Sequence, residues 1–310
     1  MFINTSVGIS QFPSDALSAE QMLRNADSAL FKAKSAGRDG YALYTEELTA
    51  HAQQRVEIAF ELRRALDQQE LRIHYQPVHD LKTGRLVGVE ALVRWAHPQR
   101  GLVSPAAFIP IAERTGLIAE IDAWVMQQTC EQMCQWQAAG VVLSFVAVNV
   151  SSRLFARREL YQQVARVLDA TGLDPAYLEL EVTESAVMDD PEVSLEQMHR
   201  LRELGVRLAI DDFGTGYSSL LRLKRLPLQK LKIDQGFVTG LPWDEDDAAI
   251  VRVIIALAQS VGMQVHAEGI EQVGQAGFLL EHDCDLGQGY WFGRPLPAEQ
   301  LDWMCEPDIH

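Results

Sequence analysis

Beyond about residue 70, short apolar segments alternate with longer segments in which apolar residues recur three and four positions apart. The first pattern predicts strands and the second predicts amphipathic helices. The predicted strands are residues 71–78, 86–95, 144–151, 177–184, 206–212, 229–234, 263–269 and 284–290, and the clearest helices are 119–139, 190–204 and 246–261. Such alternation favours parallel strands joined by crossover helices, and eight strands are enough to close an α/β barrel.

The first 45 residues do not follow this alternation. Residues 4–10 predict a short strand, and a helix follows that begins after Ser18 and ends at Gly37. Residues 46–68 form a charged segment with apolar residues at helical spacing, which we interpret as a connector helix. One strand and one helix bury too little surface to fold alone. We therefore predict an N-terminal fragment over 1–45, a connector helix over 46–68 and a barrel over 62–305.

Composition and charge limit the possible partners. The chain has 310 residues, 47% of them hydrophobic, and a formal net charge of −16. Because an acidic chain repels nucleic acid polymers and anionic membranes, we expect neither as a partner. No apolar run approaches the about 20 residues that span a bilayer, and the N-terminus lacks a signal-peptide pattern, which predicts a cytoplasmic location. The four cysteines show no disulfide or zinc-site spacing, so we expect structural thiols.

Polar residues gather at the C-terminal ends of the predicted strands, where barrel enzymes place their chemistry. They are Glu90, Asn149, Glu181, Asp211, Asp212, Lys232, Asp234, Glu268 and Gln288. One carboxylate at a strand end is more often a helix cap, but here seven strands contribute. Carboxylates that converge on one barrel mouth resist ionisation unless cations lie among them. Oxygen ligands without clustered histidine or cysteine favour Mg²⁺ or Mn²⁺ over zinc.

The segment RLAIDDFGTGYSSL, residues 207–220, places two adjacent aspartates at the end of a predicted buried strand. Adjacent side chains leave a strand on different sides, so Asp211 could bridge two ions while Asp212 reaches only one. Two divalent ions are the usual arrangement for in-line displacement at phosphorus. Gly214 and Gly216 would let the following loop bend tightly beside the ions.

Seven segments, in this order, resemble the EAL-family phosphodiesterases of bacterial cyclic di-GMP signalling. They are EALVRW (90–95), NVS (149–151), EVTE (181–184), DDFGTGYSSL (211–220), KIDQGF (232–237), AEGIE (267–271) and QGYWFGRPLP (288–297). The resemblance extends from about Leu62 to Trp303 and implies a TIM-like (β/α)8 barrel, in which we expect one antiparallel strand. Residues 1–45 are similar to the C-terminal end of a GGDEF diguanylate cyclase domain, but the cyclase signature is absent.

The resemblance also implies a role for each matched residue. Glu90, Asn149, Glu181 and Asp211 would bind one metal ion, and Asp211, Asp212 and Glu268 would take part at the second. Lys232 would help to activate the attacking water together with Asp234, Glu184 would hold the loop of residues 213–219, and Glu268 and Asp212 would also serve catalysis. Gln76, Arg94, Asp234 and Gln288 would contact the substrate. The implied reaction is hydrolysis of cyclic di-GMP to linear pGpG by in-line attack of water, with two Mg²⁺ or Mn²⁺ ions.

Two other polar residues lie within predicted strands. Glu179 alternates in phase with Glu181 and should point the same way two residues deeper, where an unpaired charge is costly. The sequence offers no evident partner for it. We expect His266 to be a core histidine rather than a metal ligand, because oxygen ligands already fill the predicted site.

Alternative functions use the same residues differently. The barrel could be a non-catalytic receptor that binds cyclic di-GMP and signals through the connector helix. An enolase-like metal barrel that acts on a carboxylate substrate is a more distant alternative, because it explains neither the adjacent aspartates nor Lys232. The resemblance further implies a homodimer with its contact near residues 213–219, and we expect no membrane contact by this chain.

Overall fold

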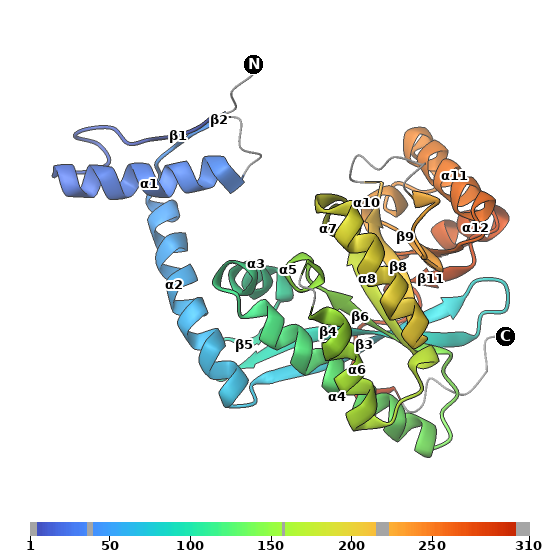
Figure 1. The fold of residues 1–310 in the computed structure, drawn as a ribbon. Helices are drawn as coiled ribbons and strands as arrows, with labels where there is room; N and C mark the ends of the chain where they lie inside the picture. Colours follow the sequence, from blue (N-terminus) through green and yellow to red (C-terminus); the bar gives the residue numbers. More distant parts are fainter. Residues whose placement is uncertain (1–4, 36–39, 157–158, 215–222, 302–310) are drawn as a thin grey trace. The chain divides into compact units, whose positions relative to one another are not determined.

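The computed structural model describes residues 5–35, 40–156, 159–214 and 223–301 of the chain (Figure 1). Two compact units are present, residues 1–68 and residues 69–310. In the first unit, β1 (Ser6–Ile9) pairs in parallel with β2 (Gly40–Leu43), and α1 (Ala19–Ser35) packs against both strands before α2 (Glu46–Asp67) begins.

The local signals in the first unit explain most of its elements. The hydroxyl of Ser18 accepts a hydrogen bond from the backbone N–H of Gln21 at 3.3 Å, so Ser18 caps α1 as predicted. The short strand β2 was not predicted. The predicted helix end at Gly37 lies outside the described residues, and the relation of this unit to a GGDEF domain stays a prediction.

The second unit is a closed barrel of eight strands within the described residues. The strands are β3 (Leu71–Asp80), β4 (Leu86–His97), β6 (Phe145–Val150), β7 (Leu178–Thr183), β8 (Arg207–Phe213), β9 (Lys230–Ile233), β10 (Gln264–Ala267) and β11 (Leu286–Gln288). They follow the order β3–β11–β10–β9–β8–β7–β6–β4, and β4 pairs back onto β3 to close the ring. All eight predicted strands are confirmed.

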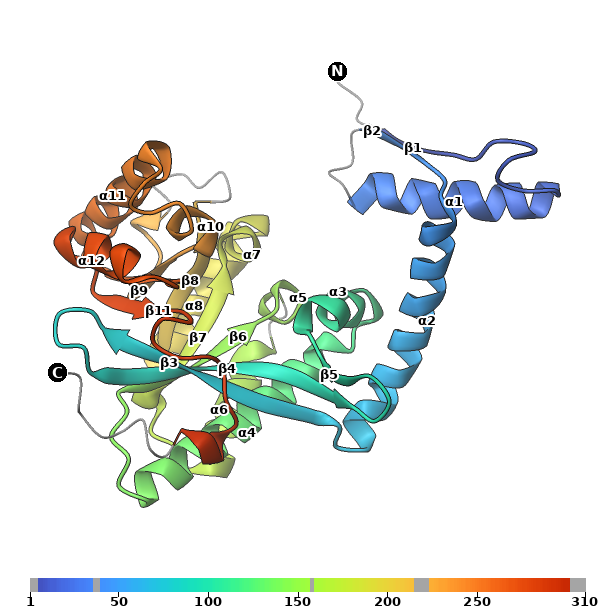
Figure 2. The same cartoon turned by 180° about the vertical axis from the view of Figure 1, so that it is seen from behind.

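One strand of the barrel runs against the others. β3 is antiparallel to both β4 and β11, while the remaining neighbours in the ring are parallel. Figure 2 shows the long β3–β4 hairpin from behind. The predicted antiparallel strand is therefore confirmed. The short strand β5 (Gly101–Val103), which pairs with the end of β4, was not predicted.

Helices surround the strands of the barrel (Figure 1). They are α3 (Pro105–Thr115), α4 (Ile118–Ala138), α5 (Ser152–Phe155), α6 (Leu160–Thr171), α7 (Glu184–Asp189), α8 (Pro191–Leu204), α10 (Gln235–Val238), α11 (Glu245–Ser260) and α12 (Val273–Glu281), with 3₁₀ turns η1 (Pro175–Tyr177) and η2 (Ala298–Gln300). Apolar side chains on one face of each long helix, such as Val125 of α4 and Ile254 of α11, are buried. This burial is the main driving force for the barrel.

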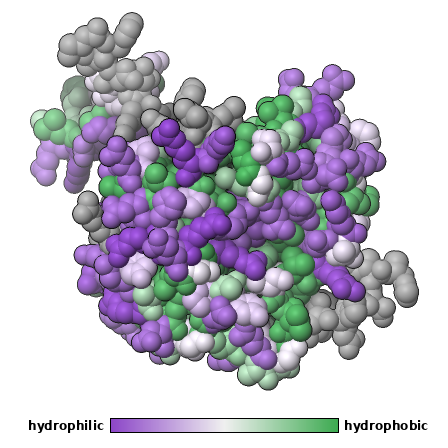
Figure 3. Space-filling model, turned by 45° about the vertical axis from the view of Figure 1, so that its right-hand side comes forward, coloured by the Kyte–Doolittle hydropathy of each residue, from purple (hydrophilic) through white to green (hydrophobic). Residues whose placement is uncertain are grey.

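The molecular surface carries a mixture of side chains. Figure 3 shows hydrophilic and hydrophobic residues interspersed over one face. Among the helices in the described part of the chain, we find none with the length and apolar character required to cross a bilayer.

Candidate active site

The amino group of Lys232 lies at the centre of the strand-end carboxylates. Its Nζ atom is 2.6 Å from Glu181 Oε2, 2.6 Å from Glu268 Oε1 and 3.3 Å from Asp211 Oδ1. Glu90 Oε2 is 3.9 Å away. These residues come from β4, β7, β8, β9 and the segment after β10. The structure thus brings together residues that are up to 178 positions apart, from Glu90 to Glu268, because parallel strands present their C-terminal ends at one mouth of the barrel.

Amide side chains hold the carboxylate of Glu90. Gln288 Nε2 donates to Glu90 Oε2 at 2.6 Å and to Gln76 Oε1 at 3.1 Å. Asn149 Nδ2 donates to Glu90 Oε1 at 2.6 Å. An amide that donates through its nitrogen keeps its oxygen as an acceptor or metal ligand. The predicted positions Gln76, Glu90, Asn149 and Gln288 therefore form one network.

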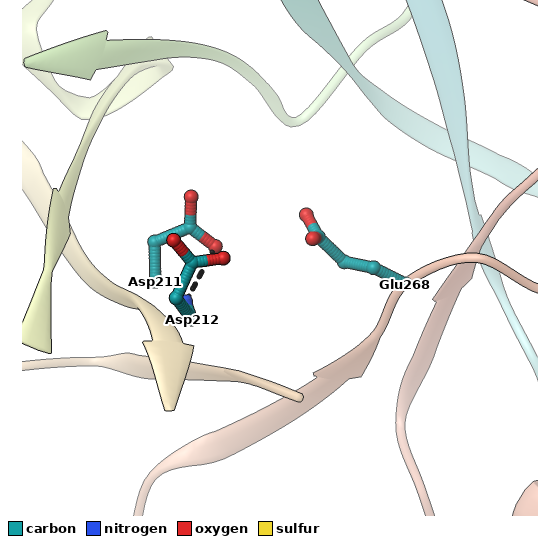
Figure 4. Close-up of side chains that lie close together, drawn as sticks. All are labelled: Asp211, Asp212 and Glu268. Atoms are coloured by element: carbon teal, nitrogen blue, oxygen red, sulfur yellow. Dashed lines mark hydrogen bonds between the residues drawn. The ribbon is translucent and has the colours of Figure 1, made fainter. Parts of the chain in front are cut away.

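The two adjacent aspartates lie where β8 departs from regular pairing. The register between β8 and β9 shifts between Ile210 and Phe213, and Asp212 has a φ of 53°. Aspartate tolerates this left-handed region better than most residues, although at some cost in strain. The Asp212 N–H donates to Asp211 Oδ1 at 3.0 Å. As a result both carboxylates turn toward Glu268, which approaches from the end of β10 (Figure 4).

These three carboxylates could hold a metal ion. Asp211, Asp212 and Glu268 each offer an oxygen atom within 4.8 Å of the others. Glu181 Oε1 and Gln288 Oε1 are buried and have no hydrogen-bond partner among the described residues. Several clustered oxygen donors, two of them without partners, fit a hard divalent cation of the kind that carboxylates and amide oxygens bind.

The pKa values point to the same need for positive charge. Burial raises the pKa of Glu268 to about 8, although Lys232 acts in the opposite direction. Burial and then the carboxylates of Asp211 and Asp234 raise the pKa of Asp212 to about 6. Burial also raises the pKa of Glu181 well above its usual value. Burial alone would lower the pKa of Lys232, but the surrounding carboxylates outweigh it and raise this pKa.

Glu184 connects the start of α7 to the segment after β8. Its side chain is buried, and Oε2 accepts a hydrogen bond from the Gly214 N–H at 3.0 Å. Gly214 has a φ of 102°, which favours glycine. The residues of the predicted loop beyond Gly214, 215–219, lie outside the described residues.

A cavity of about 350 Å³ opens beside the carboxylates. The predicted residues Gln76, Glu90, Arg94, Asp211, Glu268 and Gln288 line it, together with Leu92, Gln235, Gly269, Glu271, Gly289, Tyr290 and Pro295. Asp234 lies just beyond β9, where its Oδ1 accepts from the Gly236 N–H at 2.9 Å and caps α10. Gln235 and Glu271 were not predicted as site residues, although they lie within the quoted motifs KIDQGF (232–237) and AEGIE (267–271).

Glu179 has a partner that the sequence did not reveal. Lys230 Nζ lies 2.6 Å from Glu179 Oε1 and 3.7 Å from the centroid of the Phe145 ring. Lys230 reaches across β8, which presents the small residue Ala209 in register with it. His266 is buried nearby as expected for a core histidine, and burial lowers its pKa well below the usual value.

Comparison with known proteins identifies the family. The EAL domain model matches residues 59–295, and the chain therefore belongs to the EAL-domain family. It is 45% identical over 299 residues to the bifunctional diguanylate cyclase/cyclic di-GMP phosphodiesterase MucR of Pseudomonas aeruginosa, covering 96% of this chain and 44% of that protein. It is 42% identical over 302 residues to the cyclic di-GMP phosphodiesterase NbdA of the same organism, covering 97% and 39%. The chain thus spans less than half the length of these two relatives.

Solved structures agree with this assignment. The PaMucR phosphodiesterase in complex with c-di-GMP is 47% identical, with a TM-score of 0.77, and the match covers 79% of this chain and 99% of that one. The cGMP-bound EAL enzyme Bd1971 is 29% identical, with a TM-score of 0.78, and the match covers 94% and 77%. The barrel predicted from the sequence is the fold of the family.

Proposed function

We propose that this chain hydrolyses cyclic di-GMP to linear pGpG. The observation that carries the proposal is the cluster of strand-end carboxylates around Lys232, at the edge of a cavity that Arg94 also lines. The names of MucR and NbdA, both cyclic di-GMP phosphodiesterases, support the choice of substrate. So does the c-di-GMP complex of PaMucR.

The donor atoms suggest how two Mg²⁺ or Mn²⁺ ions would be held. Glu90, Asn149, Glu181 and Asp211 would bind one ion, and Asp211, Asp212 and Glu268 would take part at the other. When bound, the ions would supply Lewis-acid polarisation of the phosphodiester and a lowered pKa for the attacking water. The left-handed backbone at Asp212 would keep both adjacent carboxylates turned toward the ion that Glu268 also serves, while Asp211 would reach the other ion as well.

The remaining residues would orient the reactants. Lys232, which stays protonated because carboxylates surround it, would hold the attacking water and offset negative charge that develops on the phosphate. Asp234 would orient that water with Lys232. Arg94 would pair with a phosphate, because its guanidinium matches the geometry of phosphate oxygens. Gln76 and Gln288 would fix the ligand through the amide network that also holds Glu90.

Chromatography of cyclic di-GMP after incubation with the purified protein and Mg²⁺ tests the proposal. We expect conversion to the linear dinucleotide, and no conversion with excess chelator. Cyclic di-GMP that is bound but recovered unchanged in the presence of Mg²⁺ would favour the receptor alternative instead.

We also propose that the active form is a homodimer. The Glu184–Gly214 hydrogen bond ties the segment after β8 to the two aspartates, so a change in that segment would move metal ligands. The resemblance implies a dimer contact near residues 213–219, so association of two chains would favour the productive form of this segment. Specific activity should therefore rise with protein concentration, measured alongside light scattering. Glu184→Ala should fold but lose most activity. A fully active monomer with an unaffected Glu184→Ala variant would refute this proposal.

A further inference from the structure

The side-chain amide of Gln275 makes four hydrogen bonds from within the first turn of α12. Its Oε1 accepts from the N–H groups of Glu271 at 2.8 Å and Gln272 at 2.9 Å. Its Nε2 donates to the carbonyls of Val238 at 3.0 Å and Thr239 at 3.3 Å. The side chain is only 3% exposed. A buried amide with both its oxygen and its nitrogen bonded holds its partners at a fixed spacing.

The two sets of partners belong to two segments that contribute residues to the cavity: Glu271 itself lines it, and Val238 and Thr239 end the helix that begins at the cavity residue Gln235. Glu271 and Gly269, from the segment 268–272 after β10, line the cavity, and so does Gln235 at the start of α10. The two segments also touch directly, because a Cβ atom added at Gly269 would lie 2.6 Å from Gln235 Cβ. Gln275 therefore joins the segment that follows Glu268 to the segment that follows Lys232.

The same segment is fastened on its other side. The Ile270 N–H donates to the Gln288 carbonyl at 3.0 Å, and the Trp291 N–H donates to the Ile270 carbonyl at 2.9 Å. Ile270 itself is fully buried. Two residues earlier, the Glu268 N–H donates to the Ile233 carbonyl at 3.2 Å. Backbone bonds therefore fix Ile270 toward β11 and Glu268 to the end of β9. The Gln275 side chain adds two hydrogen bonds to Glu271 and Gln272 and two to Val238 and Thr239 at the end of α10.

We propose that Gln275 is a positioning residue that sets the placement of Glu268 and of the cavity wall 268–272 relative to α10. It acts through the backbone and touches neither substrate nor the reacting atoms. Only an amide of this length can accept from one segment and donate to the other, because a carboxylate would face the Val238 and Thr239 carbonyls and a methionine could bond to neither. The kcat measurement rests on the proposed function, because it uses cyclic di-GMP as the substrate. The measurement of Mg²⁺ affinity does not depend on that function.

The test compares Gln275→Met with Gln197→Met in the full chain. Gln197 is a matched control, because it is also 3% exposed and donates to the carbonyl of a short helix, Phe155 of α5, at 2.7 Å. Mg²⁺ affinity is measured by calorimetry, kcat and KM by chromatography of cyclic di-GMP, and stability by thermal unfolding. We expect Gln275→Met to weaken Mg²⁺ binding or lower kcat by about 10- to 100-fold, as loss of an outer-shell partner does.

The control variant Gln197→Met should lose thermal stability, but its Mg²⁺ affinity and kcat should stay close to those of the unsubstituted protein. If Gln275→Met does not fold, the milder Gln275→Asn decides, because an amide one methylene shorter cannot span both segments and should show the same losses. Normal Mg²⁺ affinity and normal kcat in a folded Gln275 variant, or equal losses in Gln197→Met, would overturn the inference. If the unsubstituted protein does not hydrolyse cyclic di-GMP, the proposed function fails, and the Mg²⁺ affinities alone decide the role of Gln275.

Discussion

Two buried ion pairs lie one above the other inside the barrel, on the same two strands. Glu181 pairs with Lys232 and, two residues deeper, Glu179 pairs with Lys230; the oxygen-to-nitrogen distance is 2.6 Å in each. All four side chains are nearly inaccessible to solvent. In residue type, spacing and geometry the two pairs are equivalent.

Their surroundings differ. The upper pair is joined by Asp211 and Glu268 and lies at the cavity, so negative charge exceeds the single ammonium. The lower pair is balanced, and the Phe145 ring covers Lys230. A balanced buried pair has no need of a further cation, whereas the upper cluster does. A buried charged pair is therefore a candidate site only where the charges around it are unbalanced and a cavity gives access to them.

Removal of divalent ions should have the largest effect on activity, because it should affect the upper cluster and leave the lower pair unchanged. We expect hydrolysis of cyclic di-GMP to stop in excess EDTA and to return with Mg²⁺ or Mn²⁺. Calcium should support ligand binding without turnover, because its longer and more flexible coordination would misplace the attacking water. Chromatographic assay with each ion checks this, and turnover in excess EDTA would refute a metal-dependent upper cluster.

Substitutions in the upper cluster should cause the next largest loss of activity. Lys232→Ala and Asp212→Asn should each lower kcat by about 100-fold or more, because they remove groups that act in the transition state. Binding of cyclic di-GMP should fall much less in Lys232→Ala, as measured by calorimetry with Ca²⁺. Near-normal activity in either variant would contradict the assigned roles.

Substitution in the lower pair should affect stability instead. Lys230→Met leaves Glu179 buried without its cation and should lower the free energy of unfolding by about 3–5 kcal/mol. The double variant Glu179→Gln/Lys230→Met removes both charges and should recover most of that loss in urea denaturation. A double variant as unstable as the single one would show that the lower pair does not behave as an isolated charge pair.

Asp122 is a buried carboxylate that has no ion-pair partner among the described residues, and pH distinguishes it from the two ion pairs. Asp122 accepts hydrogen bonds from the Ser151 N–H and hydroxyl, and burial raises its pKa from 3.8 to about 7. Between these values the folded protein holds a proton that the unfolded chain has released, so the free energy of unfolding falls as pH rises. From pH 5 to pH 8 this loss is on the order of 2–4 kcal/mol.

Asp122→Asn cannot ionise and should lose this component of the pH dependence. Urea denaturation at both pH values, in EDTA, compares the variant with the unsubstituted protein. Asp174→Asn, at an exposed helix cap, is the control and should keep the original pH dependence. The prediction fails if Asp122→Asn and the unsubstituted protein lose the same stability between the two pH values.

The sequence predicted the ring of strands because each strand carries its own hydrophobic pattern. It also predicted Asp211, Lys232 and Glu268 at the C-terminal ends of strands, where a parallel barrel makes them meet. The prediction of Glu90 at a strand end was wrong, because β4 (Leu86–His97) continues well beyond its pairing with β6 and Glu90 lies inside it. It did not predict the Glu179–Lys230 pair, because that contact depends on the small Ala209 of the strand between them. Nor did it predict Gln275, whose pattern is that of an ordinary residue in a first helical turn. Both depend on side-chain reach between segments far apart in the chain.

In the proposed function, the upper cluster directs water at a phosphodiester of cyclic di-GMP. The most direct test of this function is hydrolysis in oxygen-18 water with Mg²⁺, followed by mass spectrometry of the product. We expect linear pGpG with one oxygen-18 atom in its terminal phosphate, because one water adds across the cleaved phosphorus–oxygen bond. Cyclic di-GMP that is recovered intact and unlabelled after incubation with a molar excess of the protein would contradict the proposed hydrolysis.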